Sequence, residues 1–348
     1  MITLNGSRVI VTGGAGFIGS ELVRQLIARG AKVTVIDNLV NGRRENLAGL
    51  PAQKVQLVVA DIRHAERMQK LLKGADLVYH LACLGVRHSI HSPVENHQVN
   101  ALGTLNLLIA ARKNKVPRFV YVSSSEVYGS ARSVPMDEEH PALPITVYGG
   151  SKMAGECYTR AYYHTYGYPA VVVRPFNAYG PRSHHESDSG EVIPKFMLRC
   201  MAGIPMTIFG DGRQTRDFTY VGDTARGILT AGLCQEALGR ILNIGQGRET
   251  KIKDLAQKVR KILGKPDAPL KHDRPRPGDV LRLYSDTRLA RRMIGFKPTI
   301  SLEQGLLLLR DWYLESGQSP EELLKEERLH NWNLPPGTKL RRDRKGRS

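Results

Sequence analysis

The sequence has few cysteines and no long apolar run. Its four cysteines are scattered and form no CxxC pair, which favours reduced thiols over a disulfide framework. No apolar stretch approaches the ~20 residues that a helix needs to span a bilayer. No signal peptide precedes the first predicted strand. We therefore expect a cytoplasmic protein that has no membrane partner.

Signatures of nucleic-acid binding and of metal binding are also missing. The formal net charge is +18, but we find neither a nucleic-acid-binding fold signature nor a basic strand interleaved with aromatic residues. Much of the excess charge lies in KLRRDRKGRS at the end of the chain, and we expect residues 335–348 to be a disordered basic tail. His184, His185 and Glu186 lack the i,i+4 spacing of helical metal ligands. We predict no nucleic-acid partner and no metal.

The first half of the chain alternates short β-branched apolar runs with helical patterns. The predicted strands are 8–12, 32–37, 55–60, 77–81, 119–123 and 170–174. The predicted helices are 20–29, 65–72, 99–113 and 151–166. Strands that are apolar throughout are buried on both faces, and this alternation is typical of an α/β fold with a parallel, doubly wound sheet.

The second half is less regular. Its predicted helices are 193–202, 221–233, 252–263 and 302–315. We expect residues 240–246 to return to the first sheet as a strand, and the proline-rich residues 265–279 to form a loop. The predicted organisation is thus a Rossmann-type domain over 1–180, with a smaller lobe over 181–330 interleaved with it.

The first predicted strand runs directly into the glycine-rich turn VTGGAGFIGS and then into a helix. Gly13, Gly16 and Gly19 permit a tight turn, a close approach of the backbone to a pyrophosphate, and close packing of the helix on the sheet. The amino end of that helix offers free N–H groups and a positive dipole end to phosphates. Asp37 ends the second strand, where a carboxylate binds the adenosine ribose and repels a 2′-phosphate. The pattern predicts NAD rather than NADP.

Candidate catalytic groups follow later. Tyr148 and Lys152 are four residues apart near the start of a predicted helix, so both lie on one helical face. We expect the ammonium of Lys152 to stabilise tyrosinate and to lower the pKa of the Tyr148 phenol toward neutrality, as a base at pH 7 requires. A serine cluster, SSSEVYG, follows a buried strand, at the edge where α/β sheets bind ligands. Ser124 can orient a substrate hydroxyl there.

In combination these motifs resemble one family. Over Arg8 to Asp311 the chain resembles the extended branch of the short-chain dehydrogenase/reductase superfamily, the NAD-dependent nucleotide-sugar epimerases and dehydratases. The motifs that carry the resemblance are VTGGAGFIGS, the aspartate of VID, HLA, SSSEVYG, YGGSK, RPFNAYGP and RDFTYVGD. The resemblance implies that the substrate is a nucleotide-diphosphate sugar. It also implies a homodimer formed through the helices predicted at 99–113 and 151–166.

The resemblance also assigns roles to individual residues. The implied catalytic residues are Ser124, Tyr148, Lys152 and Glu126. The implied cofactor-binding residues are Gly13, Gly16, Phe17, Ile18, Gly19, Asp37, Asn38, Asp61, Ile62, Leu81, Ala82 and Lys152. The implied substrate-binding residues are Ser124, Ser125, Asn177, Arg216 and Arg276. The two arginines suit the substrate's diphosphate because guanidinium groups bind phosphate oxygens in pairs.

The implied first step is shared by the whole family. Tyr148 removes the proton of the sugar 4-hydroxyl, and the C4 hydride passes to NAD, which leaves a 4-keto sugar before the hydride returns. A 4-epimerase is our leading interpretation, because it needs only Ser124, Tyr148 and Lys152. A 4,6-dehydratase that uses Glu126 is the alternative, although Ser125 stands where dTDP-glucose dehydratases carry an acidic residue. UDP-glucuronate decarboxylation, a simple ketone reductase and a non-catalytic NAD-binding protein are further alternatives.

Overall fold

The computed structural model describes residues 3–187, 189–276 and 279–330. Its centre is a seven-stranded sheet in the order β3-β2-β1-β4-β5-β6-β11, and all neighbouring pairs are parallel. The strands are β1 (Arg8–Thr12), β2 (Lys32–Asp37), β3 (Val55–Val59), β4 (Leu77–His80), β5 (Phe119–Val122), β6 (Ala170–Pro175) and β11 (Ile241–Ile244). The predicted doubly wound α/β sheet is confirmed.

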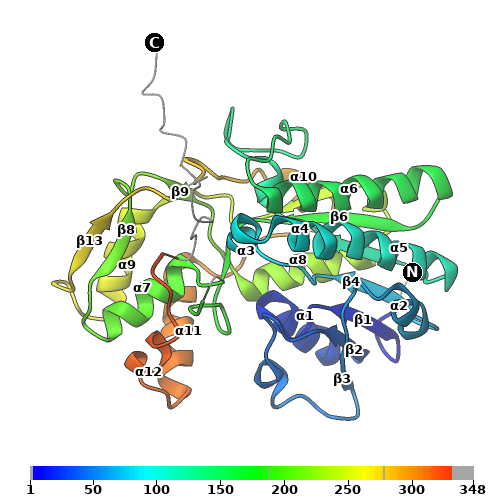
Figure 1. Ribbon diagram of the computed structural model, residues 1–348, viewed down its shortest axis with the longest axis horizontal. Coiled ribbons are helices and arrows are strands. Elements are labelled where there is room, and N and C mark those ends of the chain that lie inside the picture. Colours follow the sequence, from blue (N-terminus) through cyan, green and yellow to red (C-terminus); the bar gives the residue numbers. More distant parts are fainter. Residues whose placement is uncertain (1–2, 188, 277–278, 331–348) are drawn as a thin grey trace.

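Helices cover both faces of this sheet (Figure 1). On one face lie α1 (Phe17–Ala28), α8 (Val221–Leu233) and α10 (Arg288–Ile294), which share one core cluster with the strands. On the other lie α2 (Ala65–Leu71), α5 (Gly103–Lys113) and α6 (Val147–Tyr166), which share a second cluster. The short helices α3 (Val86–His91) and α4 (Pro93–His97) precede α5, which they join through a π-helical turn, Gln98–Leu102.

The smaller lobe, at the left of Figure 1, packs around its own apolar cluster. Its helices are α7 (Val192–Met201), α9 (Ile252–Ile262), α11 (Leu302–Glu315) and α12 (Pro320–Leu324). Its short strand pairs are β7 (Ala178–Tyr179) with β10 (Thr219–Tyr220), β9 (Thr215–Arg216) with β12 (Thr250–Lys251), and β8 (Met206–Phe209) with β13 (Leu270–Asp273).

Two sequence-based predictions fail locally. The prediction of a loop over 265–279 is wrong, because β13 lies inside that range and pairs in parallel with β8. Its sequence LKHD has no apolar pattern, so only its partner strand reveals it. Helix α6 begins at Val147 rather than at 151, because the Thr146 side chain caps it by accepting a hydrogen bond from the Gly149 amide at 3.0 Å.

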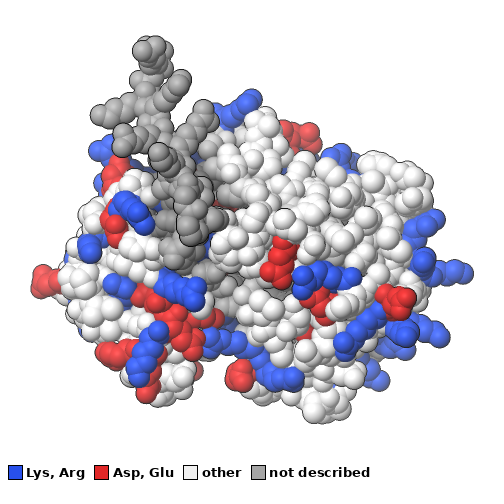
Figure 2. All heavy atoms as spheres, in the orientation of Figure 1, with Lys and Arg blue, Asp and Glu red and all other residues white. Residues whose placement is uncertain are grey.

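The described helices include none with the length and apolarity that a bilayer span requires. Figure 2 shows Lys and Arg side chains gathered at the end of the molecule where α2 and α5 lie. On these two helices Lys70 and Lys113 are exposed. These cations lie on or near the last turns of the two helices, where they favour the negative end of the helix dipole.

Candidate active site

A cavity of about 630 Å³ lies at the carboxyl ends of the parallel strands, where the sheet faces the smaller lobe. All residues that the sequence singled out for cofactor, substrate or catalysis line this one cavity. They come from segments far apart in the chain, which the sheet order brings together at a single edge. Such an edge is where open α/β sheets bind their ligands.

The glycine-rich turn forms one wall of the cavity. Gly13 adopts a φ of +70°, and a Cβ atom there would lie 2.6 Å from the backbone nitrogen of Ala82. A Cβ atom on Gly19 would lie 2.1 Å from the Gly13 carbonyl oxygen. Side chains at these two positions would therefore push the turn away from the sheet. With glycine in place, α1 begins directly after Gly16 and presents its first N–H groups to the cavity.

Asp37 is buried at the end of β2. Its carboxylate accepts hydrogen bonds from the Ala15 amide at 3.0 Å and from the Leu39 amide at 2.9 Å. Burial raises the pKa of this carboxyl, and the two amide hydrogen bonds act against that rise. The nearby guanidinium of Arg43 forms ion pairs with Glu186 at 3.3 Å and Glu326 at 2.9 Å. Arg43 could otherwise bind the 2′-phosphate of NADP, but it is already paired with these two carboxylates.

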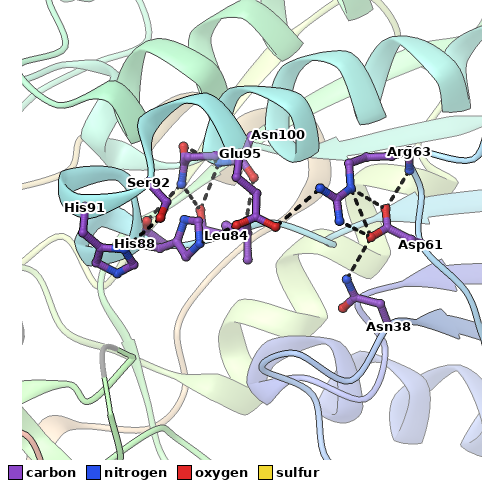
Figure 3. A network of polar contacts seen from close by, with 11 residues as sticks. Asn38, Asp61, Arg63, Leu84, His88, His91, Ser92, Glu95 and Asn100 are labelled. Atoms are coloured by element: carbon purple, nitrogen blue, oxygen red, sulfur yellow. Dashed lines mark hydrogen bonds and ion pairs between the residues drawn. The ribbon is translucent and has the colours of Figure 1, made fainter.

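A polar network extends from this end of the cavity toward α3 (Figure 3). Asn38 donates a hydrogen bond to Asp61 at 3.3 Å, and Arg63 forms an ion pair with Asp61 at 2.7 Å. Arg63 also contacts Glu95, which in turn contacts His88 at 3.3 Å. Burial acts against ionisation of Asp61, but the hydrogen bonds from Arg63 lower its pKa to about 2. Asp61 is thus a fixed anion beside the expected adenosine site.

The candidate catalytic groups lie deeper in the same cavity. Lys152 is fully buried, and its ammonium donates to the Val122 carbonyl at 2.7 Å while lying 4.6 Å from the centre of the Tyr121 ring. Ser124 caps the turn that carries Glu126, since its Oγ accepts from the Glu126 amide at 3.2 Å. Tyr148 shares side-chain hydrogen bonds with Ser124 and Cys83. One turn of α6 therefore places phenol and ammonium together at the end of β5.

The predicted fall in the pKa of the Tyr148 phenol is wrong for this ligand-free structure. Burial raises that pKa well above the ordinary value, and the interactions with Cys83 and Glu126 act in the same direction. Only the Ser124 hydrogen bond is a lowering influence of note. Burial is the main cause of this rise. Lys152 directs its ammonium to the Val122 carbonyl.

Charged groups at the other end of the cavity suit an anionic substrate. Arg216 pairs with Asp279, and the guanidinium of Arg276 lies 5.2 Å from the centre of the Phe209 ring. Burial, together with the charge of the neighbouring Arg87, lowers the pKa of Arg276 to about 9. The side-chain oxygen of Asn177 is buried and has no hydrogen-bond partner among the described residues. Buried cations that repel each other are stabilised when a diphosphate binds between them.

Comparison with known proteins agrees with this geometry. The family model for GDP-mannose 4,6-dehydratase matches residues 10–308. The UDP-glucose 4-epimerase of Mycolicibacterium smegmatis is 35% identical over 315 residues, covering 89% of this chain and 100% of that protein. The Thermotoga maritima UDP-glucose 4-epimerase, solved with UDP-glucose, has a TM-score of 0.84 and 33% identity, covering 89% of this chain and 100% of that one. A dTDP-glucose 4,6-dehydratase of Streptomyces venezuelae, solved with NAD, has a TM-score of 0.84 and 35% identity, covering 88% and 97%.

The chain belongs to the nucleotide-sugar epimerase and dehydratase family of extended short-chain dehydrogenase/reductases. The family predicted from the motifs is therefore confirmed. In this epimerase/dehydratase the cavity fits NAD on two observations. The turn at Gly13 leaves room where a Cβ atom would collide with backbone, and the buried Asp37 carboxylate still has lone pairs to accept ribose hydroxyls.

In this epimerase/dehydratase the cavity-lining residues that the motifs did not indicate include Cys83, Arg87, Glu191 and Lys195. Cys83 and Arg87 follow β4, so their position after a buried strand was an available signal. Glu191 and Lys195 belong to the start of α7, whose sequence reads as an ordinary amphipathic helix. Burial raises the pKa of Glu191 to about 7.

The histidine-rich segment after β7 takes part in ion pairs. His184 contacts Glu186 at 3.0 Å and His185 contacts it at 3.4 Å. Burial acts against ionisation of Glu186, but the hydrogen bond from His184 lowers its pKa to about 2. Over residues 3–187, 189–276 and 279–330, no group of three His, Cys, Asp or Glu side chains has a metal-binding arrangement.

Proposed function

We propose that this protein is a nucleotide-diphosphate-sugar 4-epimerase, and a UDP-sugar is its leading substrate class. One observation carries the proposal: a single cavity is lined by the glycine turn with Asp37, by Ser124, Tyr148 and Lys152, and by Arg216 and Arg276. Residues 1–180 with β11 would bind NAD, and 181–330 the sugar nucleotide. We further propose that it acts in the cytoplasm, where its four free cysteines stay reduced.

The chain's own residues would prepare the sugar for oxidation and hold it. When bound, NAD supplies the acceptor and later the donor of the C4 hydride. Tyr148 takes the proton of the sugar 4-hydroxyl, and Ser124 holds that oxygen through a hydrogen bond. Lys152 orients the cofactor ribose. Arg216 and Arg276 bind the diphosphate, so that the sugar can turn over while the nucleotide stays fixed.

A 4,6-dehydratase is the alternative, and Glu126 is the observation that favours it. Its carboxyl lines the cavity, and burial raises its pKa, which suits an acid–base group that works near neutral pH. Ser125 supplies no second carboxyl beside it. An epimerase has no need of a group at Glu126, because its hydride leaves and returns at the same carbon.

A panel of UDP-, GDP-, dTDP- and CDP-sugars, analysed by product mass, separates these reactions. An epimer of unchanged mass supports the proposal, loss of one water indicates the dehydratase, and loss of carbon dioxide indicates the decarboxylase. Tyr148→Phe should lower turnover by about 10²- to 10⁴-fold, the range for loss of a general base, while NAD still binds. Tyr166→Phe is the matched control, because Tyr166 lies on the same helix but is 51% exposed. Activity of Tyr148→Phe equal to that of this control would refute the assignment.

We also propose a homodimer formed through α5 and α6. Leu102, Ile109 and Val94 are exposed apolar residues. Leu102 directly precedes α5, Ile109 lies on it, and Val94 lies on α4. Leu102 and Ile109, seven residues apart, share one helical face. A dimer would remove this stripe from water. Light scattering of the native chain should give twice the monomer mass, and Leu102→Glu with Ile109→Glu should give the monomer. A monomeric native chain at micromolar concentration would refute the proposal.

A further inference from the structure

The last described part of the chain closes over the substrate end of the cavity. The family model ends at residue 308, whereas the described chain continues through α12 to His330. We call residues 326–330 the strap. Glu327 and Leu329 of the strap line the cavity. An addition to the family match thus contributes part of the wall of the proposed active site.

Contacts to three separate elements hold the strap in place. The Ser187 amide donates to the Glu326 carbonyl at 2.9 Å, and the Glu326 carboxylate pairs with Arg43 at 2.9 Å. At the other end, His330 contacts the Asp273 carboxylate of β13 at 3.0 Å. The strap is therefore tied both to the loop after β2, on the cofactor side, and to the smaller lobe.

Between these ties the strap engages two cations of α7. Lys195 donates to the Arg328 carbonyl at 2.7 Å, and Arg199 pairs with the Glu327 carboxylate at 2.6 Å. The Glu327 side chain is only 5% exposed. Its second carboxylate oxygen is buried and has no hydrogen-bond partner among the described residues. Arg199 and Lys195 both line the cavity as well.

These cations belong to a cluster whose positive charges repel one another. Burial and the charges of Arg87, Arg276 and Arg199 lower the pKa of Lys195 to about 7, while Glu327 acts in the opposite direction. Arg276 is the residue that we assign to the substrate's diphosphate. Glu327 therefore supplies a negative charge to the same cation cluster that would receive the anionic substrate.

We propose that the strap is a built-in competitor of the substrate, in which Glu327 holds Arg199 and must be displaced or weakened when a nucleotide diphosphate binds to the same cation cluster. This proposal rests on the proposed function, because that function places the diphosphate beside Arg276. Loss of the Glu327 charge frees Arg199 and removes a repulsive carboxylate from the cavity wall. Affinity for a nucleoside diphosphate should then rise.

The test is calorimetric titration of the full-length native chain and of Glu327→Gln with UDP, GDP and dTDP. We expect Glu327→Gln to bind the preferred nucleotide about three- to tenfold more tightly, the effect of about one partly buried charge pair. Glu321→Gln is the matched control, since it removes the same charge from an exposed position on α12 of the same extension. It should bind within about twofold of the native chain. Added salt should reduce the gain of Glu327→Gln, because salt screens the repulsion.

Unchanged or weaker binding by Glu327→Gln, with a melting temperature like that of the control, would overturn the proposal and make the strap an ordinary part of the binding wall. A truncated chain that ends at residue 325 is a second test. It should bind the nucleotide at least as tightly as Glu327→Gln does. The sugar-product assay separates the two proposals. If Glu327→Gln binds the nucleotide more tightly but no epimer forms, the strap proposal holds and the proposed epimerase reaction is refuted. If an epimer forms but Glu327→Gln has the affinity of the native chain, the strap proposal is refuted. No binding of any nucleotide by either protein refutes both.

Discussion

Replacement of Asp37 by asparagine tests how the cavity selects its cofactor. In the structure each oxygen of this buried carboxylate accepts one backbone hydrogen bond, from Ala15 at 3.0 Å and from Leu39 at 2.9 Å. Each oxygen keeps one lone-pair direction for a ribose hydroxyl. Asparagine retains one acceptor oxygen but replaces the other with an NH2 group. It also removes the negative charge that would repel a 2′-phosphate.

The expected effect can be worked out from these contacts. The variant loses one hydrogen bond between the ribose and a charged acceptor, which contributes about 1.5–3 kcal/mol. This corresponds to an increase of about ten- to 150-fold in the Kd for NAD. The Leu39 or Ala15 amide also loses its charged acceptor, so stability should fall by about 1–3 kcal/mol. The NADP affinity should fall less than the NAD affinity, because one repulsion disappears.

The assay is titration of Asp37→Asn with NADH and NADPH by fluorescence, with urea unfolding of the same sample to separate the two effects. Asp267→Asn is a suitable control, because it makes the same change at an exposed residue outside the cavity. NAD affinity within about twofold of the native chain, together with an unchanged preference over NADP, would refute the assignment of Asp37 to the ribose.

Three further predictions concern catalysis and stability. Glu126→Gln should leave an epimerase within about tenfold of native turnover but lower a dehydratase by about 10²-fold or more, measured by product mass. Glu156→Ala should lower the free energy of unfolding in urea by about 3–5 kcal/mol. The Arg174 side chain is only 3% exposed, and the substitution removes the carboxylate that pairs with it at 2.6 Å. A loss below about 1 kcal/mol would contradict a structural role for this pair. The pKa values of Asp61 and Glu186 are about 2 in the folded chain, below the ordinary values near 4, so these carboxylates stabilise the fold above pH ~4 and lose that contribution as the pH falls toward ~2. Melting temperature should drop over that interval and drop less in Glu186→Gln, and equal acid sensitivity of the two proteins would exclude Glu186 as a contributor.

Local sequence patterns predicted best those elements whose residue types are set by burial. The inner strands of the main sheet are apolar because both of their faces are covered, so each was visible as a short β-branched run. The positions of β1, β2 and β4 agree with the prediction within one residue. The glycine turn was equally visible, because its tight geometry excludes side chains. By contrast β13 is polar and exists through its pairing with β8. No local signal marks a strand of that kind.

The charge state of the catalytic tyrosine shows a different limit. Spacing placed Tyr148 and Lys152 on one face of a helix, and both do line the cavity. Spacing does not reveal how deeply a phenol is buried or where an ammonium points. In the folded chain burial raises the pKa of Tyr148, and Lys152 donates to Val122. The predicted pair is present, but its electrostatics follow from the surroundings.

By itself the sequence determined the family and its kind of chemistry, because the glycine turn, the aspartate at the end of the second strand and the tyrosine–lysine pair are short motifs that can be recognised in order along the chain. Only the tertiary structure decided which charged groups meet in the cavity. Arg87, Lys195 and Glu327 are far apart in the sequence and carry no shared motif. They come together because the sheet order and the path of the last residues bring separate segments to one edge, and the energy of a charge depends on those neighbours and on burial rather than on residue type.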